Sequence, residues 1–168
     1  WLPKIASGET VVGLAIGEPI AGARDRAGVT ADGDRLSGSA LFVTDALTAD
    51  LFVVADRAGR LHLVRGDAPG LSRAPMTTID LTRRVGELTF EATPSEPLAA
   101  HGLDAARDAA WVLLAADTLG AAEVMIEKAV AYAKERRQFG RVIGSFQAVK
   151  HMCAEMAAEL EPCRSLVW

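Results

Sequence analysis

The chain has 168 residues, of which 50% are hydrophobic, and a formal net charge of −4. This length suits one large domain or two small ones, and the hydrophobic content is sufficient for a sizeable core. The acidic balance argues against a general nucleic-acid or membrane-surface binder, and the sequence shows neither a signal peptide nor the long apolar run of a membrane span.

The first 98 residues predict a β-domain. After an apolar opening at residues 1–8, Thr10–Ile16 is β-branched and apolar, as is typical of a strand. The Asp32-Gly33 pair indicates a hairpin turn, and further strands are expected at 36–44, 49–55, 61–64 and 85–91. Six or seven short strands separated by turn residues favour a small antiparallel barrel or sandwich.

Two features of this half need a functional or a structural interpretation. The loop Gly17–Gly22 is rich in helix and strand breakers, and its composition alone indicates a connecting turn. His62 lies in an apolar strand, so we interpret it as a hydrogen-bonded structural histidine and not as a ligand. Residues 61–100 otherwise offer no catalytic constellation.

From residue 99 onwards the pattern becomes helical. Residues 103–137 fit one helix, about 50 Å long at 1.5 Å per residue, and a second helix should run from near Phe146 toward Arg164, with Pro162 breaking or kinking it. Such helices pack lengthwise in bundles. The predicted fold class is therefore α+β, with a small antiparallel β-barrel or sandwich domain (1–98) followed by long antiparallel helices of a helix bundle (99–168).

The stretch Tyr132–Gln147 joins the two predicted helices and belongs to a basic cluster between residues 128 and 150. Its cations complement the dipole at a helix C-terminus and could also hold a discrete anionic ligand; they are Lys134, Arg136, Arg137 and Arg141. Gly140 would stop the first helix, and Gly144-Ser145 would restart the chain before the second. From spacing alone, this is a capped helix followed by a solvated, charged turn.

The register of the same stretch points further. Arg136, Gln138, Phe139, Gly140, Ile143, Phe146 and Gln147 follow the pattern R-x-Q-F-G-x-x-I-x-x-F-Q. This resembles the signature of the acyl-CoA dehydrogenase family, flavoenzymes that desaturate acyl-CoA thioesters. The resemblance covers nearly the whole chain and implies that 1–98 is the middle β-domain of that family and 99–168 the incomplete start of its C-terminal bundle.

The resemblance also implies a flavin site made by two subunits. In this family the residues matching Arg136, Gln138, Phe139 and Gln147 reach the FAD of a neighbouring subunit in a homo- or hetero-oligomer. A guanidinium suits a pyrophosphate, and a phenyl ring can pack beside adenine. The other wall of the flavin is expected from the β-domain.

On the β-domain, the family's flavin loop has the form T/S-E-P-G-x-G-S-D. Glu18, Pro19 and Gly22 match it, whereas Gly17, Ile20 and the pair Ala23-Arg24 do not, so backbone contacts are retained and side-chain contacts are lost. The run 36–44 resembles the strand whose aromatic and final hydroxyl pack on the flavin. The cofactor-binding residues implied on this side are Ile16, Gly17, Glu18, Gly22, Phe42, Val43 and Thr44, with Ala23 at the substrate.

Residues 103–107 resemble the segment that lines the acyl-CoA site, which implies that Asp104 and Arg107 contact the pantetheine arm. Chemistry alone gives Asp104 a stabilising place at a helix N-terminus and pairs it with Arg107 one turn later. Some members carry the catalytic glutamate at the position of Ala106, and alanine cannot abstract a proton. We therefore expect no catalytic residue in this segment and place the base on a later helix.

The resemblance implies an FAD-dependent acyl-CoA dehydrogenase of fatty-acid or steroid side-chain degradation that passes electrons to a separate acceptor. The two cysteines, Cys153 and Cys163, show no disulfide or metal-ligand spacing, so we expect a cytoplasmic protein without a metal site. Because the chain starts at Trp1, we expect a segment of a longer protein that alone does not turn over acyl-CoA. The altered loop leaves two alternatives open, a non-catalytic partner subunit of a hetero-oligomeric dehydrogenase and a flavin-free binding module.

Overall fold

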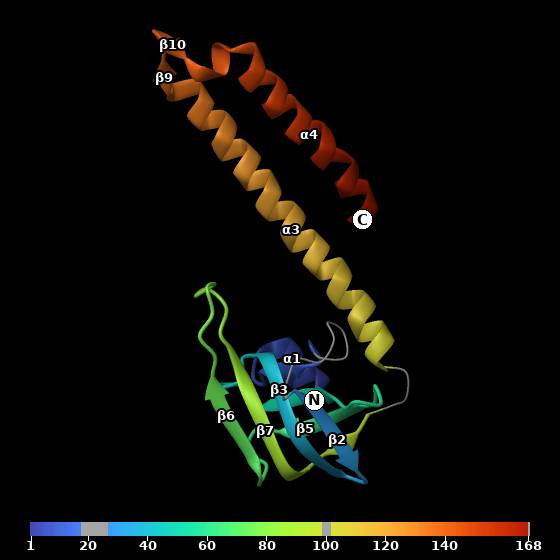
Figure 1. Ribbon diagram of the computed structural model, residues 1–168. Helices are drawn as coiled ribbons and strands as arrows, with labels where there is room; N and C mark the ends of the chain where they lie inside the picture. The colour runs from blue at the N-terminus through green and yellow to red at the C-terminus, as the bar shows by residue number, and fades with distance from the viewer. Residues whose placement is uncertain (18–26, 99–101, 168) are drawn as a thin grey trace. The chain divides into compact units, whose positions relative to one another are not determined.

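The computed structural model of the chain describes residues 1–17, 27–98 and 102–167 (Figure 1). They form two compact units, Trp1–Arg107 and Asp108–Trp168, which are described separately below. The predicted site residues Glu18, Gly22 and Ala23 lie outside the described residues.

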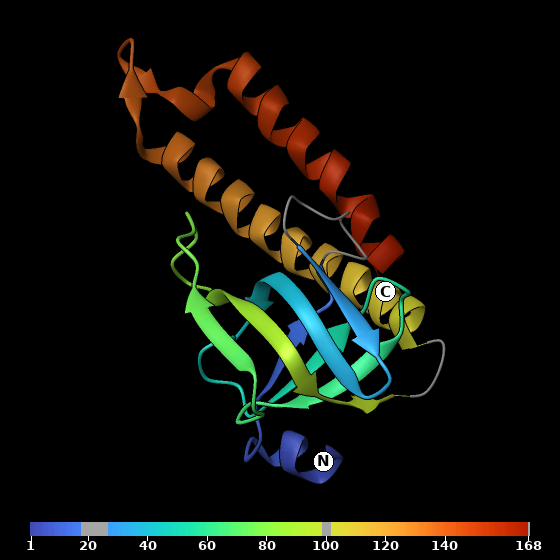
Figure 2. The same cartoon turned by 60° about the horizontal axis from the view of Figure 1, so that its bottom comes forward.

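The first unit contains two four-stranded sheets, with strand orders β1-β4-β5-β8 and β2-β3-β7-β6 (Figure 2). Apolar side chains from both sheets meet in one core, among them Phe52 of β4 and Leu36 and Phe90 of the other sheet. The strands are β1 (Val12–Ala15), β2 (Gly28–Asp32), β3 (Arg35–Thr44), β4 (Leu51–Ala55), β5 (Leu61–Arg65), β6 (Leu71–Pro75), β7 (Val85–Pro94) and β8 (Glu96–Pro97). The predicted mainly antiparallel β-domain is confirmed, with one parallel pair, β1 and β4.

The predicted turn at Asp32-Gly33 is also confirmed. β2 and β3 pair antiparallel up to Asp32 and Arg35, and Gly33 has a φ of 58°, which glycine adopts without a Cβ clash. Further along β3, the pairing with β7 shifts between Ala40 and Val43. This bulge re-aims the end of β3, where several predicted site residues lie.

Two elements differ from the sequence prediction. Residues 1–8 contain a short helix, α1 (Leu2–Ser7), because Pro3 suits a first helical turn and Gly8 closes the helix in the left-handed region. β6 lies in a stretch for which no strand is predicted, and it is held by its pairing with β7 from Leu71–Phe90 to Pro75–Gly86.

The second unit is built on two long helices, α3 (Gly102–Glu135), whose first residues belong to the first unit, and α4 (Gln147–Val167). They run antiparallel side by side in both views, and an ion pair between Glu123 and Arg164 joins them (Figures 1 and 2). Between them lie β9 (Arg137–Gln138), β10 (Arg141–Val142) and the 3-10 turn η1 (Ile143–Ser145). Pro162 does not break α4, which continues to Val167.

No long apolar run is predicted from the sequence, but α3 contains one. By length and composition alone it could cross a membrane, a test that core helices of soluble proteins also pass. In the described part of the chain several large apolar side chains of α3 are exposed; Leu113 is 70% and Met125 60% accessible to solvent. A helix that exposes so many large apolar side chains needs further apolar surroundings, such as the rest of a bundle.

Candidate functional site

At and after the bulge, the last three residues of β3 lie in different environments. Phe42 has a φ of 56° and is 46% exposed, whereas Val43 is fully buried in the core. The Phe42 N–H donates to Met76 Sδ at 3.3 Å, and Thr44 Oγ1 accepts the N–H of Leu14 at 3.2 Å. The Thr44 oxygen therefore receives a hydrogen bond from β1 and keeps its own proton for another partner.

The chain after β1 lies beside this bulge. A Cβ on Gly17 would stand 3.7 Å from the carbonyl oxygen of Leu41, so the backbone of Gly17 lies close to β3. Ile16 is buried in a small apolar cluster that also includes Leu103 and Ala106 from the start of α3. The structure thus brings Ile16, Gly17 and the β3 bulge together, and at Ala106 it places a methyl group among apolar neighbours.

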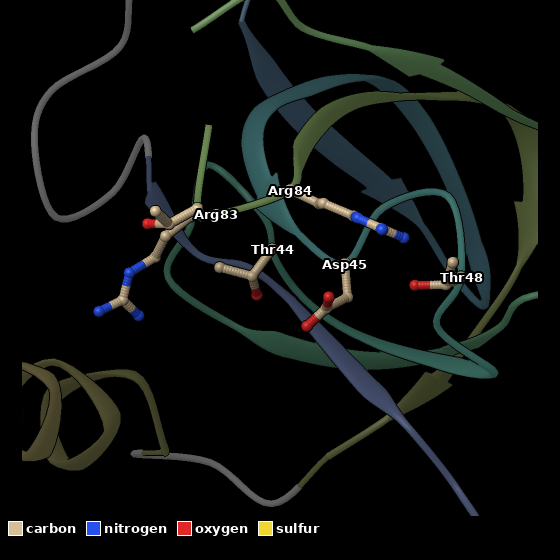
Figure 3. Close-up of a pocket in the computed structure, with 6 residues that line it drawn as sticks. Thr44, Asp45, Thr48, Arg83 and Arg84 are labelled. Carbon is tan, nitrogen blue, oxygen red and sulfur yellow. The ribbon is translucent and has the colours of Figure 1, made fainter. Parts of the chain in front are cut away.

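A cavity of about 610 Å³ opens next to Thr44 and is lined by Thr44, Asp45, Thr48, Thr82, Arg83 and Arg84 (Figure 3). The Asp45 N–H donates to the Arg84 carbonyl at 3.0 Å, which fixes the two walls to each other. Arg84 extends toward Thr48, and Arg83 points to the opposite side (Figure 3). Sequence reasoning missed these arginines, although the Arg83-Arg84 pair before a strand was a visible signal.

A second cavity, of about 640 Å³, lies at the start of α3; we call it the α3-start cavity. Leu103 and Asp104 form one wall, and the other residues are Gly33, Ala58, Gly59, Arg60, Leu61, His62, Pro97 and Leu98. Asp104 pairs with Arg107 at 2.8 Å, the contact expected for a helix start. This pairing leaves the Asp104 side chain 76% exposed at the cavity.

Behind this cavity lies a buried polar network that the sequence did not reveal. Asp56, 1% exposed, accepts the N–H groups of Ala58 and Arg60 at 2.9 Å and the Arg60 Nε at 2.8 Å. Burial alone would raise the pKa of the Asp56 carboxyl, but hydrogen bonds from Arg60 and His62 outweigh it and hold the pKa below its ordinary value.

His62 completes the network. Its Nε2 lies 3.3 Å from Asp56 Oδ2, and its Nδ1 lies 3.3 Å from Ser95 Oγ, which in turn donates to the Asp34 carbonyl at 3.1 Å. The prediction of a hydrogen-bonded structural histidine is confirmed. Among the described residues, no cluster of histidine, cysteine or acidic side chains could hold a metal ion.

The stretch between α3 and α4 is a β-hairpin where the sequence predicted a charged turn. Gln138 pairs with Arg141, and the two residues between them, Phe139 and Gly140, have φ values of 52° and 76°. Two positive φ values are the mark of a type I′ turn. The turn carries Phe139 to the tip of the hairpin, where 90% of it is exposed.

Aromatic and cationic side chains of this hairpin pack against Phe146. The Phe139 ring meets Phe146 edge-on at 6.1 Å, and the Arg141 guanidinium lies 4.0 Å from the Phe146 ring centre. The Arg136 carbonyl accepts the Ile143 N–H at 2.7 Å, so the hairpin closes directly onto the end of α3. The connection between α3 and α4 therefore carries the residues that are predicted as one group: Arg136, Gln138, Phe139 and, at the first position of α4, Gln147.

Comparison with known proteins gives the chain its relatives. Residues 101–168 match the family described as acyl-CoA dehydrogenase, C-terminal domain. Acyl-CoA dehydrogenase IpdE2 of Mycobacterium tuberculosis is 39% identical over 126 residues, which cover 75% of this chain and 37% of the relative. The short-chain specific acyl-CoA dehydrogenase of Clostridium acetobutylicum is 30% identical over 195 residues, which cover all of this chain and 50% of the relative.

Solved structures agree over both units. The Tcur3481-Tcur3483 steroid ACAD variant superposes with a TM-score of 0.85 at 36% identity, over 99% of this chain and 48% of that one. The acyl-CoA dehydrogenase of Geobacillus kaustophilus gives a TM-score of 0.84 at 30% identity, over 99% and 50%. The chain spans half or less of the length of these relatives.

Proposed function

The chain belongs to the acyl-CoA dehydrogenase family, and on that premise we propose that it is part of an FAD-dependent enzyme that desaturates an acyl-CoA thioester between Cα and Cβ. Residues 1–98 would be the middle β-domain, and residues 99–168 the first helices of the C-terminal bundle. The acyl group would be a fatty-acid chain or a steroid side chain, as the relatives of both kinds suggest.

The observation that carries this proposal is the surface at the β3 bulge. Phe42 presents a half-exposed ring, Thr44 keeps a hydroxyl proton to donate, and the Gly17 backbone lies alongside. A flat aromatic ring with hydrogen-bond acceptors at its edge fits this set of groups. When bound there, FAD would supply the acceptor for the hydride that leaves Cβ; Phe42 would pack on its ring system and Thr44 would hold its orientation.

The remaining cofactor contacts would come from the hairpin of a second subunit. Phe139 is 90% exposed at the tip, and the Arg136 side chain is exposed at the end of α3, as a contact to another chain requires. A guanidinium binds a diphosphate through charge-assisted hydrogen bonds. We infer a homo- or hetero-oligomer in which Arg136, Gln138, Phe139 and Gln147 contact the FAD held by the neighbouring β-domain.

The thioester would enter along the start of α3. The Asp104 carboxylate lies at the α3-start cavity and can accept the N–H of a pantetheine amide, while Arg107 holds Asp104 in place. Proton abstraction from Cα needs a carboxylate within about 3 Å of the proton's carbon. Ala106 provides none, so we propose that the base comes from a later helix of the C-terminal domain.

The altered loop, with Gly17 where the family has a hydroxyl residue, favours a second candidate, a non-catalytic partner subunit in a hetero-oligomeric dehydrogenase. One experiment tests both. The full-length protein is purified with FAD, and acyl-CoA thioesters of several chain lengths and a steroid acyl-CoA are added without oxygen. Bleaching of the flavin supports the enzyme and would precede electron transfer to a separate acceptor. Bleaching that appears only after a second, flavin-binding subunit is added supports the partner role, and an assembly without flavin would refute both.

A further inference from the structure

The α3-start cavity is lined by a cationic side chain, that of Arg60, to which the proposed function gives no role. This side chain is 63% exposed. Its Nε and Nη2 both contact Asp56 Oδ2, at 2.8 and 2.7 Å. These contacts use one edge of the planar guanidinium, which has further N–H donors on its other edge.

The fold holds this guanidinium in one place. The Arg60 backbone N–H and side chain are bound by the same carboxylate, that of Asp56. Asp56 is itself fixed by the Ala58 N–H and by His62, and it is 1% exposed. Asp56 does not line the cavity, so a ligand there meets the guanidinium and not the buried carboxylate. A donor group that is already ordered loses little freedom when it binds an anion.

The other walls of the cavity match an uncharged arm with an anionic end. Leu61, Leu98 and Leu103 supply apolar surface, and Asp104 can accept an amide hydrogen. The negative charge of Asp104 is balanced by Arg107 at 2.8 Å, which limits its repulsion of an anion. A 4′-phosphopantetheine arm has amides along its length and a phosphate at its end, whether it belongs to CoA or to a carrier protein.

We propose that Arg60 binds the phosphate that ends the pantetheine arm of the thioester substrate, and that Asp56 and His62 are positioning residues for this contact. The inference rests on the proposed function, because it takes the thioester to lie along the start of α3. It assigns a specificity role to the β4–β5 turn, which would distinguish phosphorylated from unphosphorylated thioesters.

The test uses the full-length holoenzyme and three thioesters of one acyl group, those of CoA, 4′-phosphopantetheine and pantetheine. Arg60→Gln removes the charge, and Arg60→Lys keeps the charge but lacks the planar set of N–H donors of a guanidinium. Arg65→Gln is the matched control, because Arg65 lies at the other end of β5, is 64% exposed, pairs with Asp67 and does not line the cavity. In Arg60→Gln, kcat/KM should fall about ten-fold for both phosphorylated thioesters, the size expected for one charge-assisted contact at a partly exposed site.

The same substitution should leave kcat/KM for the pantetheine thioester unchanged, Arg60→Lys should recover part of the loss, and Arg65→Gln should resemble the wild type. An equal loss with all three thioesters, a loss confined to CoA, or no loss would each overturn the proposal. If the wild-type enzyme turns over none of them, the proposed function fails instead. The phosphate contact is then judged by calorimetry, where Arg60→Gln must abolish the preference for 4′-phosphopantetheine over pantetheine.

Discussion

Replacement of Asp56 by alanine should strongly destabilise the first unit, because this carboxyl group holds the β4–β5 turn together. The change would leave the Nε2 of His62, a residue only 2% exposed, without its acceptor, and would free the turn amides of Ala58 and Arg60. The Arg60 side chain is exposed and can turn to water. One buried and two partly buried donors at about 1–3 kcal/mol each, with the amides at the low end, give a loss of about 3–5 kcal/mol.

Asp56→Asn separates the two kinds of contact. The amide oxygen can still accept the two turn N–H groups, whereas the NH₂ group cannot accept from Arg60 or His62. We therefore expect a loss of about 1–2 kcal/mol, between that of alanine and the wild type. The ordering of the two variants follows from the division of donors between Oδ1 and Oδ2.

The assay is equilibrium unfolding of the full-length protein in urea, monitored by far-ultraviolet circular dichroism. The exchange rate of a backbone amide hydrogen in the β-domain gives a second measure of the stability of the first unit. Asp67→Ala is the control, since Asp67 also pairs with an arginine of β5 but at the surface; its midpoint should stay near that of the wild type. The reasoning is refuted if Asp56→Ala costs less than about 1 kcal/mol at an unchanged m-value, or if the control costs as much.

Three further predictions concern pH and the hairpin. The pKa of folded Asp56 lies below its ordinary value of 3.8, so its contribution to stability is present above about pH 4 and is lost as the pH falls through the folded pKa; acid unfolding curves of wild type and Asp56→Asn should therefore converge. Phe139→Asn should relax the positive φ of the type I′ turn but remove the edge-on contact with Phe146, so the stability in thermal unfolding should change by less than about 1 kcal/mol, while the flavin bound per subunit should fall. In the full-length assembly, Arg136→Ala should lower the bound flavin far more than Lys150→Ala, because it removes a charge-assisted contact of about 1.5–3 kcal/mol. Equal flavin content in the two variants would mean that the basic cluster only caps the helix.

Most of the fold could be predicted because its signals are local. Short runs of apolar and β-branched residues mark β1, β3, β4 and β5, the Asp32-Gly33 pair marks a hairpin, and the change to helical composition marks α3 and α4. β6 escaped prediction because Leu71–Pro75 has no alternation and contains a proline; only its neighbour β7 makes it a strand. α1 escaped because six residues are too few to show a helical period.

The polar network could not be predicted because sheet register assembles it. Val54 pairs with His62 in β4 and β5, which brings His62 back beside Asp56, and Ser95 arrives from the end of β7. Residues separated by 33 positions, as His62 and Ser95 are, show no sign in the sequence that they will meet. The candidate site divides in the same way. The motif residues of the hairpin could be named in advance, and the Arg83-Arg84 pair was visible in the sequence, whereas only the fold places Arg60 beside a cavity.

Backbone strain links the two halves of the proposed flavin site. Among the described residues, four that are not glycine have a positive φ, namely Phe42, Asp45, Ala92 and Phe139. Bulky residues seldom adopt this region, and the strain, of order 1 kcal/mol or more, persists only where the surrounding structure imposes it. Phe42 is 46% exposed and Phe139 90% exposed, so both rings keep surface that a ligand could cover. Both are proposed flavin contacts, one on each unit. A glycine or asparagine would relax either backbone, but neither side chain could cover a flavin, so the proposed flavin contact gives a reason for an aromatic ring at both positions.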